Sequence, residues 1–182
     1  VENIELSSIM VSKSGDVWLG TFSQGMIRFN KKTGEIKRYL DRGLVFDRSV
    51  LCFSEDKDGV IFFGGFNGVK KIDPISEQIS EVIIKSALEN VYDFEYIHDI
   101  VIDKFRNVWM ASYTVGVFRY SLLTQEFVHF VPRSGDSDSL NSYVINTIGL
   151  DRNGDVWLGS EESGLARFDY GKHGFDRFVR DN

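Results

Sequence analysis

The sequence predicts an all-β protein made of four β-propeller blades, each of them a sheet of four antiparallel strands. Three observations lead to this fold class. One five-residue motif occurs four times, the copies recur at a nearly constant interval, and turn residues divide each copy into short β-type runs. The composition agrees, because 42% of the 182 residues are hydrophobic and 14% are aromatic, enough for a sizeable core.

The repeated motif is a short apolar strand with an aromatic residue at its second position. It reads VWLGT (17–21), IFFGG (61–65), VWMAS (108–112) and VWLGS (156–160). The aromatic residues are Trp18, Phe62, Trp109 and Trp157, at intervals of 44, 47 and 48 residues. This period is typical of solenoids, repeat arrays and propellers, and four β-type runs per copy favour propeller blades. We expect the four side chains to be equivalent and mostly buried between neighbouring sheets, as core packing and not as ligand-stacking residues.

Turn residues flank the motif in every copy. Gly15, Gly59 and Gly154 precede it in copies one, two and four, whereas copy three has Asn107 and no glycine. We expect Asn107 to replace the turn glycine, because asparagine tolerates a positive φ better than most residues do. A second glycine follows the motif and should permit the sharp turn into the third strand. These glycines are Gly25, Gly68, Gly116 and Gly164.

The fourth copy shows its four β-type runs most clearly. They are VINTIGL (144–150), VWLGS (156–160), LARFD (165–169) and FDRFV (175–179), separated by turn sequences. The same division of the whole chain, 1–182, gives one partial propeller with blades at approximately 4–40, 48–84, 96–131 and 143–180. The chain then begins with an innermost-type strand and ends with an outermost-type strand.

Copies one and four resemble the two-component regulator propeller repeat. The segments GDVWLGTFSQGMIRFN (15–30) and NGDVWLGSEESGLARFD (153–169) are similar to its pattern, D-x-x-G-x-hydrophobic-W-hydrophobic-G-T, a short loop, then G-hydrophobic-x-R-aromatic-D. The resemblance covers nearly the whole chain, and copy two departs from the pattern most. It implies the sensor region of a hybrid two-component histidine kinase of Bacteroidetes type, in which propellers outside the inner membrane sense glycan fragments.

The resemblance carries three further expectations. The chain should be periplasmic, it should recognise an oligosaccharide, and it should signal to a histidine kinase that lies outside this sequence. Propellers of this family usually have seven blades, so four blades imply part of a larger ring. A closed four-bladed ring is the alternative. An open arc would leave two apolar blade faces bare, and these would pack against the remaining blades or a second copy.

Composition and motifs exclude several other classes of function. The net charge of −6 without a basic patch argues against nucleic acid, and the lack of an apolar run of 18 residues argues against membrane contact by this segment. The single cysteine, Cys52, is expected to be a small buried thiol. We expect no cofactor.

No arrangement of residues in the sequence supports catalysis or a metal site. His98, His129 and His173 share no motif position, and no nucleophile, phosphate or zinc motif is present. We expect His98 to be a satisfied core or channel histidine, and the other two to be solvated. A propeller lyase acting on cyclic peptide antibiotics has a similar fold, but the recurring His/Glu pair that would support this activity is missing. The acidic segments 136–138 and 151–155 are similar to calcium loops but lack the completing glutamate, so we interpret them as turns and connectors.

The loops at one end of the blades are the remaining candidates for function. Three of the four turns after the motif strand place an aromatic residue at one position, and the connections between blades carry arginines. This candidate ligand site comprises Phe22, Phe66, Tyr113, Arg42, Arg48 and Arg133. Aromatic rings, arginines and amides suit sugar rings and acidic groups. Two functions therefore stay open: a ligand-binding sensor module, or a structural or protein-interaction propeller whose aromatics only cover the blade tops.

Overall fold

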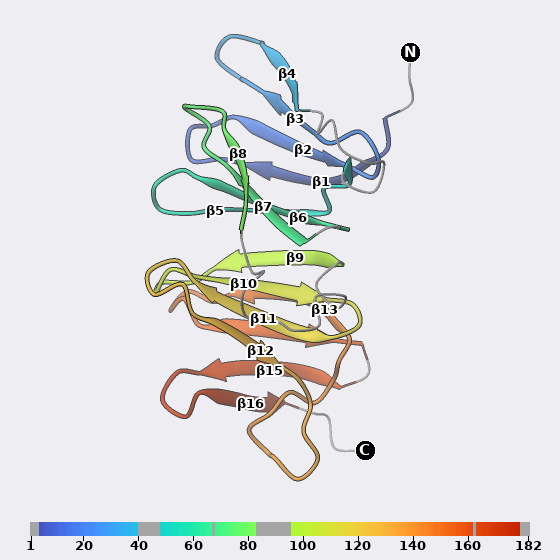
Figure 1. Cartoon of the computed structure of the whole chain (residues 1–182), viewed down its shortest axis with the longest axis vertical. Coiled ribbons are helices and arrows are strands. Elements are labelled where there is room, and N and C mark those ends of the chain that lie inside the picture. The colour runs from blue at the N-terminus through green and yellow to red at the C-terminus, as the bar shows by residue number, and fades with distance from the viewer. Residues whose placement is uncertain (1–3, 40–47, 67, 83–95, 162, 179–182) are drawn as a thin grey trace. The chain divides into compact units, whose positions relative to one another are not determined.

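The computed structural model describes residues 4–39, 48–66, 68–82, 96–161 and 163–178, which contain sixteen β-strands (Figure 1). The strands form four sheets of four, and the strands of each sheet lie side by side in sequence order. All pairings within the sheets are antiparallel. This confirms the all-β architecture of four four-stranded blades that the repeats predict. The larger ring stays a prediction.

The bounds of the strands follow the four repeats. The first sheet contains β1 (Leu6–Val11), β2 (Val17–Thr21), β3 (Met26–Phe29) and β4 (Ile36–Tyr39). The second contains β5 (Cys52–Glu55), β6 (Ile61–Gly65), β7 (Gly68–Ile72) and β8 (Ile79–Glu81). The third contains β9 (Ile97–Ile102), β10 (Asn107–Ser112), β11 (Gly116–Ser121) and β12 (Phe127–Phe130). The fourth contains β13 (Ile145–Leu150), β14 (Val156–Ser160), β15 (Gly164–Asp169) and β16 (Gly174–Phe178).

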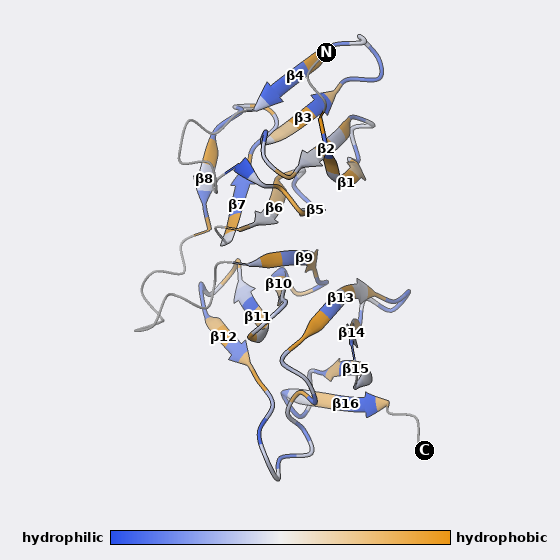
Figure 2. Cartoon of the chain, turned by 90° about the vertical axis from the view of Figure 1, so that its right-hand side faces the viewer, coloured by the Kyte–Doolittle hydropathy of each residue, from blue (hydrophilic) through white to orange (hydrophobic). Residues whose placement is uncertain are grey.

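The described residues divide into two compact units, each with a core of its own. The first unit holds β1–β8 with Tyr96 and Ile97, and the second holds the residues from His98 to β16. The first core is formed by Trp18, Met26, Val50, Ile61, Phe63 and Ile72. The second includes Trp109, Val117, Leu140, Ile145, Ile148, Leu158, Phe168 and Phe175. Hydrophobic and hydrophilic residues occur along the same strand, as in β7 and β16 (Figure 2), because successive side chains of a strand point to opposite faces.

The motif tryptophan lies in a layer of three side chains. The register pairs Trp109 with Arg119 of the third strand, and the guanidinium lies 5.8 Å from the centre of the indole. Phe130 of the outermost strand stacks on the same indole at 5.5 Å. The first and fourth sheets repeat this layer as Arg28–Trp18–Tyr39 and Arg167–Trp157–Phe178. One strand pattern therefore builds the same layer in three sheets.

The four motif aromatics are not equally buried. Trp18, Phe62 and Trp109 have exposed fractions of at most 1%, as expected. Trp157 is only partly buried, so the expectation of equal burial is wrong for the fourth copy. The reason is physical: among the described residues, no sheet packs on the face of the fourth sheet that carries Trp157.

The turns have a positive φ at the predicted glycines, but in the third copy a different residue from the expected one takes this conformation. Gly25, Gly68, Gly116 and Gly164 all have a positive φ, between 72° and 90°, as the turn into the third strand requires. Before the motif, Gly15, Gly59 and Gly154 also have a positive φ.

In the third copy the residue with positive φ is Arg106, at 64°, and not the expected Asn107. Asn107 instead begins β10, and its Nδ2 donates to Asp103 Oδ2 at 2.8 Å. The side chain is thus engaged in the turn while its neighbour takes the left-handed conformation, at a cost of about 1 kcal/mol for a residue with a Cβ.

Candidate functional site

The turns after the motif strand meet the connections between blades in both units. In the first unit, Gly25 N donates to Arg48 O at 2.7 Å, and Phe66 N donates to Ser49 Oγ at 3.0 Å. In the second unit, Gly116 N donates to Tyr143 O at 2.8 Å. Each unit therefore gathers its candidate loops at one end of its strands, which we call the loop end.

The three predicted aromatics differ in exposure. Phe22 and Tyr113 are 49% and 44% exposed, so part of each residue reaches solvent. Phe66 is partly buried, and its ring packs against Tyr96 at 4.9 Å. Phe66 thus behaves as the covering residue of the alternative interpretation. Because Phe22 and Phe66 lie in one unit and Tyr113 in the other, a shared rim stays a prediction.

The three predicted arginines are also in different situations. Arg48 is partly buried, its carbonyl accepts from Gly25, and its Nε is buried without a hydrogen-bond partner among the described residues. Arg133 has an exposed side chain whose Nη1 lies 3.9 Å from Asp136 Oδ2. Arg42 lies outside the described residues.

Tyr113 is placed against a histidine of the innermost strand. The rings of His98 and Tyr113 meet edge to face at 5.0 Å. His98 Nε2 lies 3.1 Å from Asn146 O, and since a carbonyl only accepts, this nitrogen carries the proton and donates. Burial lowers the pKa of His98 from its ordinary value of 6.5, so the neutral ring is favoured. His98 is therefore a partly buried histidine held through Nε2, beside an exposed tyrosine at the loop end.

The other two histidines do not join this pair through any hydrogen bond described in the structure. His129 is partly buried, with Nε2 2.7 Å from Val115 O and its ring stacked on Phe118 at 4.3 Å. The expectation that His129 is solvated is therefore wrong, because the outermost strand packs its side chain over the third strand. His173 is exposed, as expected, in the turn between β15 and β16.

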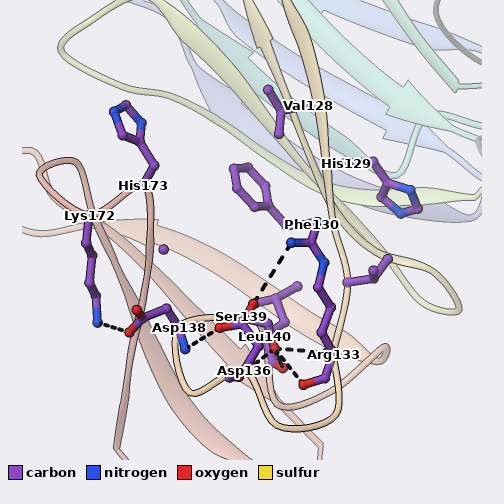
Figure 3. A pocket seen from close by; sticks show the side chains of 12 residues that line it. Val128, His129, Phe130, Arg133, Asp136, Asp138, Ser139, Leu140, Lys172 and His173 are labelled. Carbon is purple, nitrogen blue, oxygen red and sulfur yellow. Dashed lines mark hydrogen bonds and ion pairs between the residues drawn. The ribbon is translucent and has the colours of Figure 1, made fainter.

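A polar cleft of about 390 Å³ opens in the second unit beside Arg133 (Figure 3). Strand β12, the connection that follows it and the turn before β16 all contribute to its walls. The charged and aromatic residues that line it are His129, Phe130, Arg133, Asp136, Asp138, Lys172 and His173. Its volume is sufficient for a small polar ligand.

The charges in the cleft are already paired. Lys172 Nζ donates to Asp138 Oδ1 at 2.8 Å and lies 2.9 Å from Asp176 Oδ1. Hydrogen bonds from Arg167 and Lys172 lower the pKa of Asp176, and the bonds to Asp138 and Asp176 raise the pKa of Lys172. The cleft thus presents ion pairs and hydroxyl groups, which suit a hydroxyl-rich ligand better than a strongly charged one.

One arginine fixes the connection that forms the wall of the cleft. Arg177 Nε donates to Ser139 O at 2.8 Å, and its Nη2 donates to Asp136 O at 2.7 Å and to Leu140 O at 3.2 Å. Phe175 N donates to Asp138 O at 2.7 Å. Hence the segment 136–140 is held against β16 by backbone acceptors that the sequence alone does not identify.

Sequence reasoning also missed the carboxylates that orient Trp109 and Trp157. Asp103 Oδ2 accepts from Trp109 Nε1 at 2.7 Å and from Tyr170 OH at 2.6 Å. In the fourth copy, Asp151 Oδ2 accepts from Trp157 Nε1 at 3.1 Å. The signal was present, because each aspartate stands six residues before its tryptophan.

The same bonds confirm that the segment 151–155 is a turn. Asp151 Oδ1 accepts from Asn153 N at 2.8 Å and from Asp155 N at 3.0 Å. These bonds, with the indole bond, lower the pKa of Asp151. Cys52 is a buried thiol outside any disulfide, as expected. In the described part of the chain, no three His, Cys, Asp or Glu residues are grouped to hold a metal ion. That part also has no helix long and apolar enough to traverse a bilayer.

Comparison with known families and proteins agrees with the repeat pattern. A family model described as Two component regulator propeller matches residues 139–162, which include β13 and β14. The expected resemblance is thus confirmed at the fourth repeat. A curated relative, Histidine kinase P4 of Formosa agariphila, is 24% identical over 173 residues, which cover 88% of this chain and 12% of the relative.

Solved structures share the fold at low sequence identity. A catalytically inactive virginiamycin B lyase from Staphylococcus aureus, solved with quinupristin, has a TM-score of 0.78 and 16% identity over 100% of this chain and 58% of its own. The extracellular domain of a proposed hybrid two component system from B. thetaiotaomicron has a TM-score of 0.66 and 21% identity, over 87% of this chain and 19% of its own. The chain thus spans only part of each of these proteins.

Proposed function

We propose that this chain is the ligand-binding part of an extracytoplasmic two-component sensor. It would recognise a glycan fragment and signal to a histidine kinase encoded outside this sequence. The family match at 139–162, the histidine kinase relative and the fold shared with an extracellular sensor domain support a sensor propeller. The same likeness to an extracellular domain supports a periplasmic location.

The observation that carries the glycan proposal is the exposed ring of Tyr113 at the loop end. The residue is 44% exposed and its ring packs against His98, so the ring is held in place while part of it reaches solvent. Aromatic platforms beside hydrogen-bonding groups suit sugar rings. Arg133 and the polar cleft lie in the same unit and add donors and acceptors for hydroxyl groups.

The alternative function, a structural or protein-interaction propeller, is favoured by Phe66. This ring packs against Tyr96, and Phe66 is less exposed than Tyr113. Under either function we propose that the segment has no catalytic activity, because no nucleophile, base and orienting group meet at the loop end in the described residues. Turnover of a glycan or peptide by the purified protein would contradict this.

We also propose that further blades, or a second copy, cover two bare blade faces. Ile9, Val11 and Ile36 are 71%, 60% and 65% exposed on one face of the first sheet. Phe178 and Leu165 are 46% and 49% exposed in the fourth sheet, which also carries the partly exposed Trp157. The four sheets align with 58% of the lyase chain, close to four sevenths, which supports a ring of about seven blades.

A glycan array on the protein tests the sensor proposal, followed by calorimetric titration of the best ligand with variants. Tyr113→Ala should weaken binding about fivefold, the loss of roughly 1 kcal/mol of stacking, without lowering the unfolding temperature. Leu123→Ala is the matched control, because Leu123 is 67% exposed in the turn between β11 and β12, away from the loop end. Equal affinity of both variants for the ligand would exclude Tyr113 from the site.

A further inference from the structure

The first unit contains a cleft at the place where Asp103 and Tyr170 meet in the second unit. The cleft measures about 390 Å³ and lies at the ends of the strands opposite to the loop end. The turns between β1 and β2, between β5 and β6 and between β7 and β8 form its walls. The residues that matter below are Ser12, Lys13, Trp18, Lys57, Pro74 and Ile75.

Two substitutions between the repeats account for this cleft. In the second unit, the Asp103 carboxylate accepts from both Trp109 and Tyr170, which fills the space below the indole. At the position of Asp103, six residues before the tryptophan, the first repeat has Ser12. At the position of Tyr170, directly after the aspartate that ends the third strand, the second repeat has Pro74. The first unit therefore lacks both the carboxylate and the phenol.

The indole of Trp18 keeps the orientation of the other tryptophans. Trp18 pairs with Arg28 in the same register in which Trp157 pairs with Arg167, and the guanidinium–indole distances are 5.7 and 5.8 Å. Tyr39 stacks on its other side at 5.7 Å. The Trp18 N–H therefore points toward the turn at Ser12, as its equivalents point toward their aspartates.

Within the described segments, no acceptor replaces the missing carboxylate. Ser12 Oγ is 2.9 Å from Ser14 Oγ and donates to Asp16 O at 3.1 Å. Among the described residues, Trp18 Nε1 forms no hydrogen bond, although the side chain is 99% buried. Trp18 lines the cleft, so water can accept from this N–H in the absence of a ligand, and an ionised carboxylate is a stronger acceptor than a neutral one.

We propose that this cleft binds the carboxylate group of a small ligand, which takes the place that aspartate has in the third and fourth repeats. The carboxylate would accept from Trp18 Nε1. Lys13 adds positive charge at the wall, since its Nζ donates to the Asp56 carbonyl at 2.7 Å and forms no ion pair among the described residues.

The acidic residues of the wall are engaged with groups of the chain. Glu55 Oε2 accepts from Lys13 N at 2.7 Å, and Asp58 lies 2.9 Å from Lys57 Nζ. Pro74 and the 92% exposed Ile75 give the ligand an apolar flank. We therefore expect a carboxylate attached to a short apolar or ring-shaped body. This site does not depend on the proposed sensor role, because it uses none of the loop-end residues.

The test follows the indole N–H signals of the three tryptophans by NMR while sodium butyrate is added. Sodium chloride at equal ionic strength and neutral butyramide are the ligand controls. The Trp18 signal, assigned with Trp18→Phe, should shift and saturate with butyrate alone, while those of Trp109 and Trp157 stay in place. No shift, or an equal shift with butyramide, would overturn the proposal.

A second variant separates the site from nonspecific effects. Ser12→Asp supplies the missing carboxylate from the chain itself, so it should raise the unfolding temperature and weaken butyrate binding at least about tenfold. Ser137→Asp is the control, because it adds the same charge at an exposed position of the other unit and should change neither quantity. Undiminished butyrate binding by Ser12→Asp would refute the proposed position of the carboxylate.

Discussion

The third and fourth sheets contain the same layer of side chains but bury it differently. Trp109 and Trp157 each have an arginine 5.8 Å from the indole, an aromatic ring of the outermost strand stacked on it, and an aspartate bonded to Nε1. Trp109 also meets Phe168 of the next sheet at 4.7 Å and is fully buried, whereas Trp157 is partly exposed.

This difference shows that the repeat motif provides only one of the two surfaces that meet where neighbouring sheets pack together. The strand pattern places the tryptophan, its arginine and its aspartate, and these bonds form within one sheet. Burial is supplied by the neighbouring sheet, so stability is a sum of terms within blades and terms between adjacent blades. The two tryptophans allow these terms to be measured in one molecule.

The largest expected effect comes from removing each tryptophan. Trp109→Ala should lower the free energy of unfolding by about 3–5 kcal/mol, because it leaves a cavity between two sheets. Trp157→Ala should cost less, about 1–2 kcal/mol, because its outer face already meets solvent. Denaturant unfolding followed by circular dichroism measures both. Equal losses for the two variants would mean that another surface covers Trp157 in solution.

Removing the aspartate that is bonded to each of these two tryptophans should give the next largest difference in the free energy of unfolding. Asp103→Ala leaves the buried donors of Trp109, Asn107 and Tyr170 without an acceptor and should cost about 2–4 kcal/mol. Asp151→Ala should cost clearly less, because its turn is more open to water. The same unfolding experiment compares them, with Asp155→Ala as a control for a lost turn charge. A larger loss for Asp151→Ala would contradict the role of the covering sheet.

Substitutions in the turns before the motif strands should differ in their effect on stability between the fourth and third sheets. Gly154 has a φ of 76°, so Gly154→Ala should cost about 1 kcal/mol in backbone strain. Arg106 already carries this strain at a φ of 64°, and Arg106→Gly should cause no loss, because relief of the strain offsets the added entropy of the unfolded chain. Thermal unfolding of both variants measures the difference. A loss of 1 kcal/mol or more in Arg106→Gly would show that its side-chain contacts outweigh the strain.

The smallest expected effect is the pH dependence of stability caused by His98. The equivalent position of the fourth sheet has Asn146, because each is the second residue of its innermost strand. Because burial lowers the pKa of His98, the unfolded chain binds more protons than the folded one below the ordinary value of 6.5. Stability should therefore fall as the pH decreases from 7.5 through 6.5, until the folded state also takes up the proton. Asp99 and Asn146 O favour the charged ring and limit the loss. His98→Asn should show a flatter dependence of unfolding temperature on pH, and an unchanged slope would exclude His98 as the cause.

Local patterns were sufficient to predict the sheets and most turns. The strand positions follow from alternation, and the glycines at positive φ follow from the repeat. The burial of Trp157, by contrast, depends on whether another sheet covers it, which no local pattern contains. The exposure of Phe66 depends in the same way on Tyr96, thirty residues later in the chain.

For the candidate site, the sequence predicted which residues stand at the turns better than it predicted the contacts of their side chains. Phe22 and Tyr113 reach solvent at the turns where the repeat places them, but the edge contact between Tyr113 and His98 joins residues of different strands. Arg177 and the segment that it holds are 37 to 41 residues apart, and most of the acceptors are backbone carbonyls, which any residue type offers. The aspartate bonded to Trp109 and its equivalent at Trp157 were the partners that spacing alone could have identified.

The segment 136–140 also protects the outer edge of β16. An outermost strand presents a row of free backbone groups to which another chain can add a strand, and chains of similar repeats are prone to such aggregation while they fold. Here Phe175 N is already bonded to Asp138 O, and Arg177 holds the segment beside it. The connection that leads into the fourth blade therefore also occupies the strand edge at which another chain could otherwise pair.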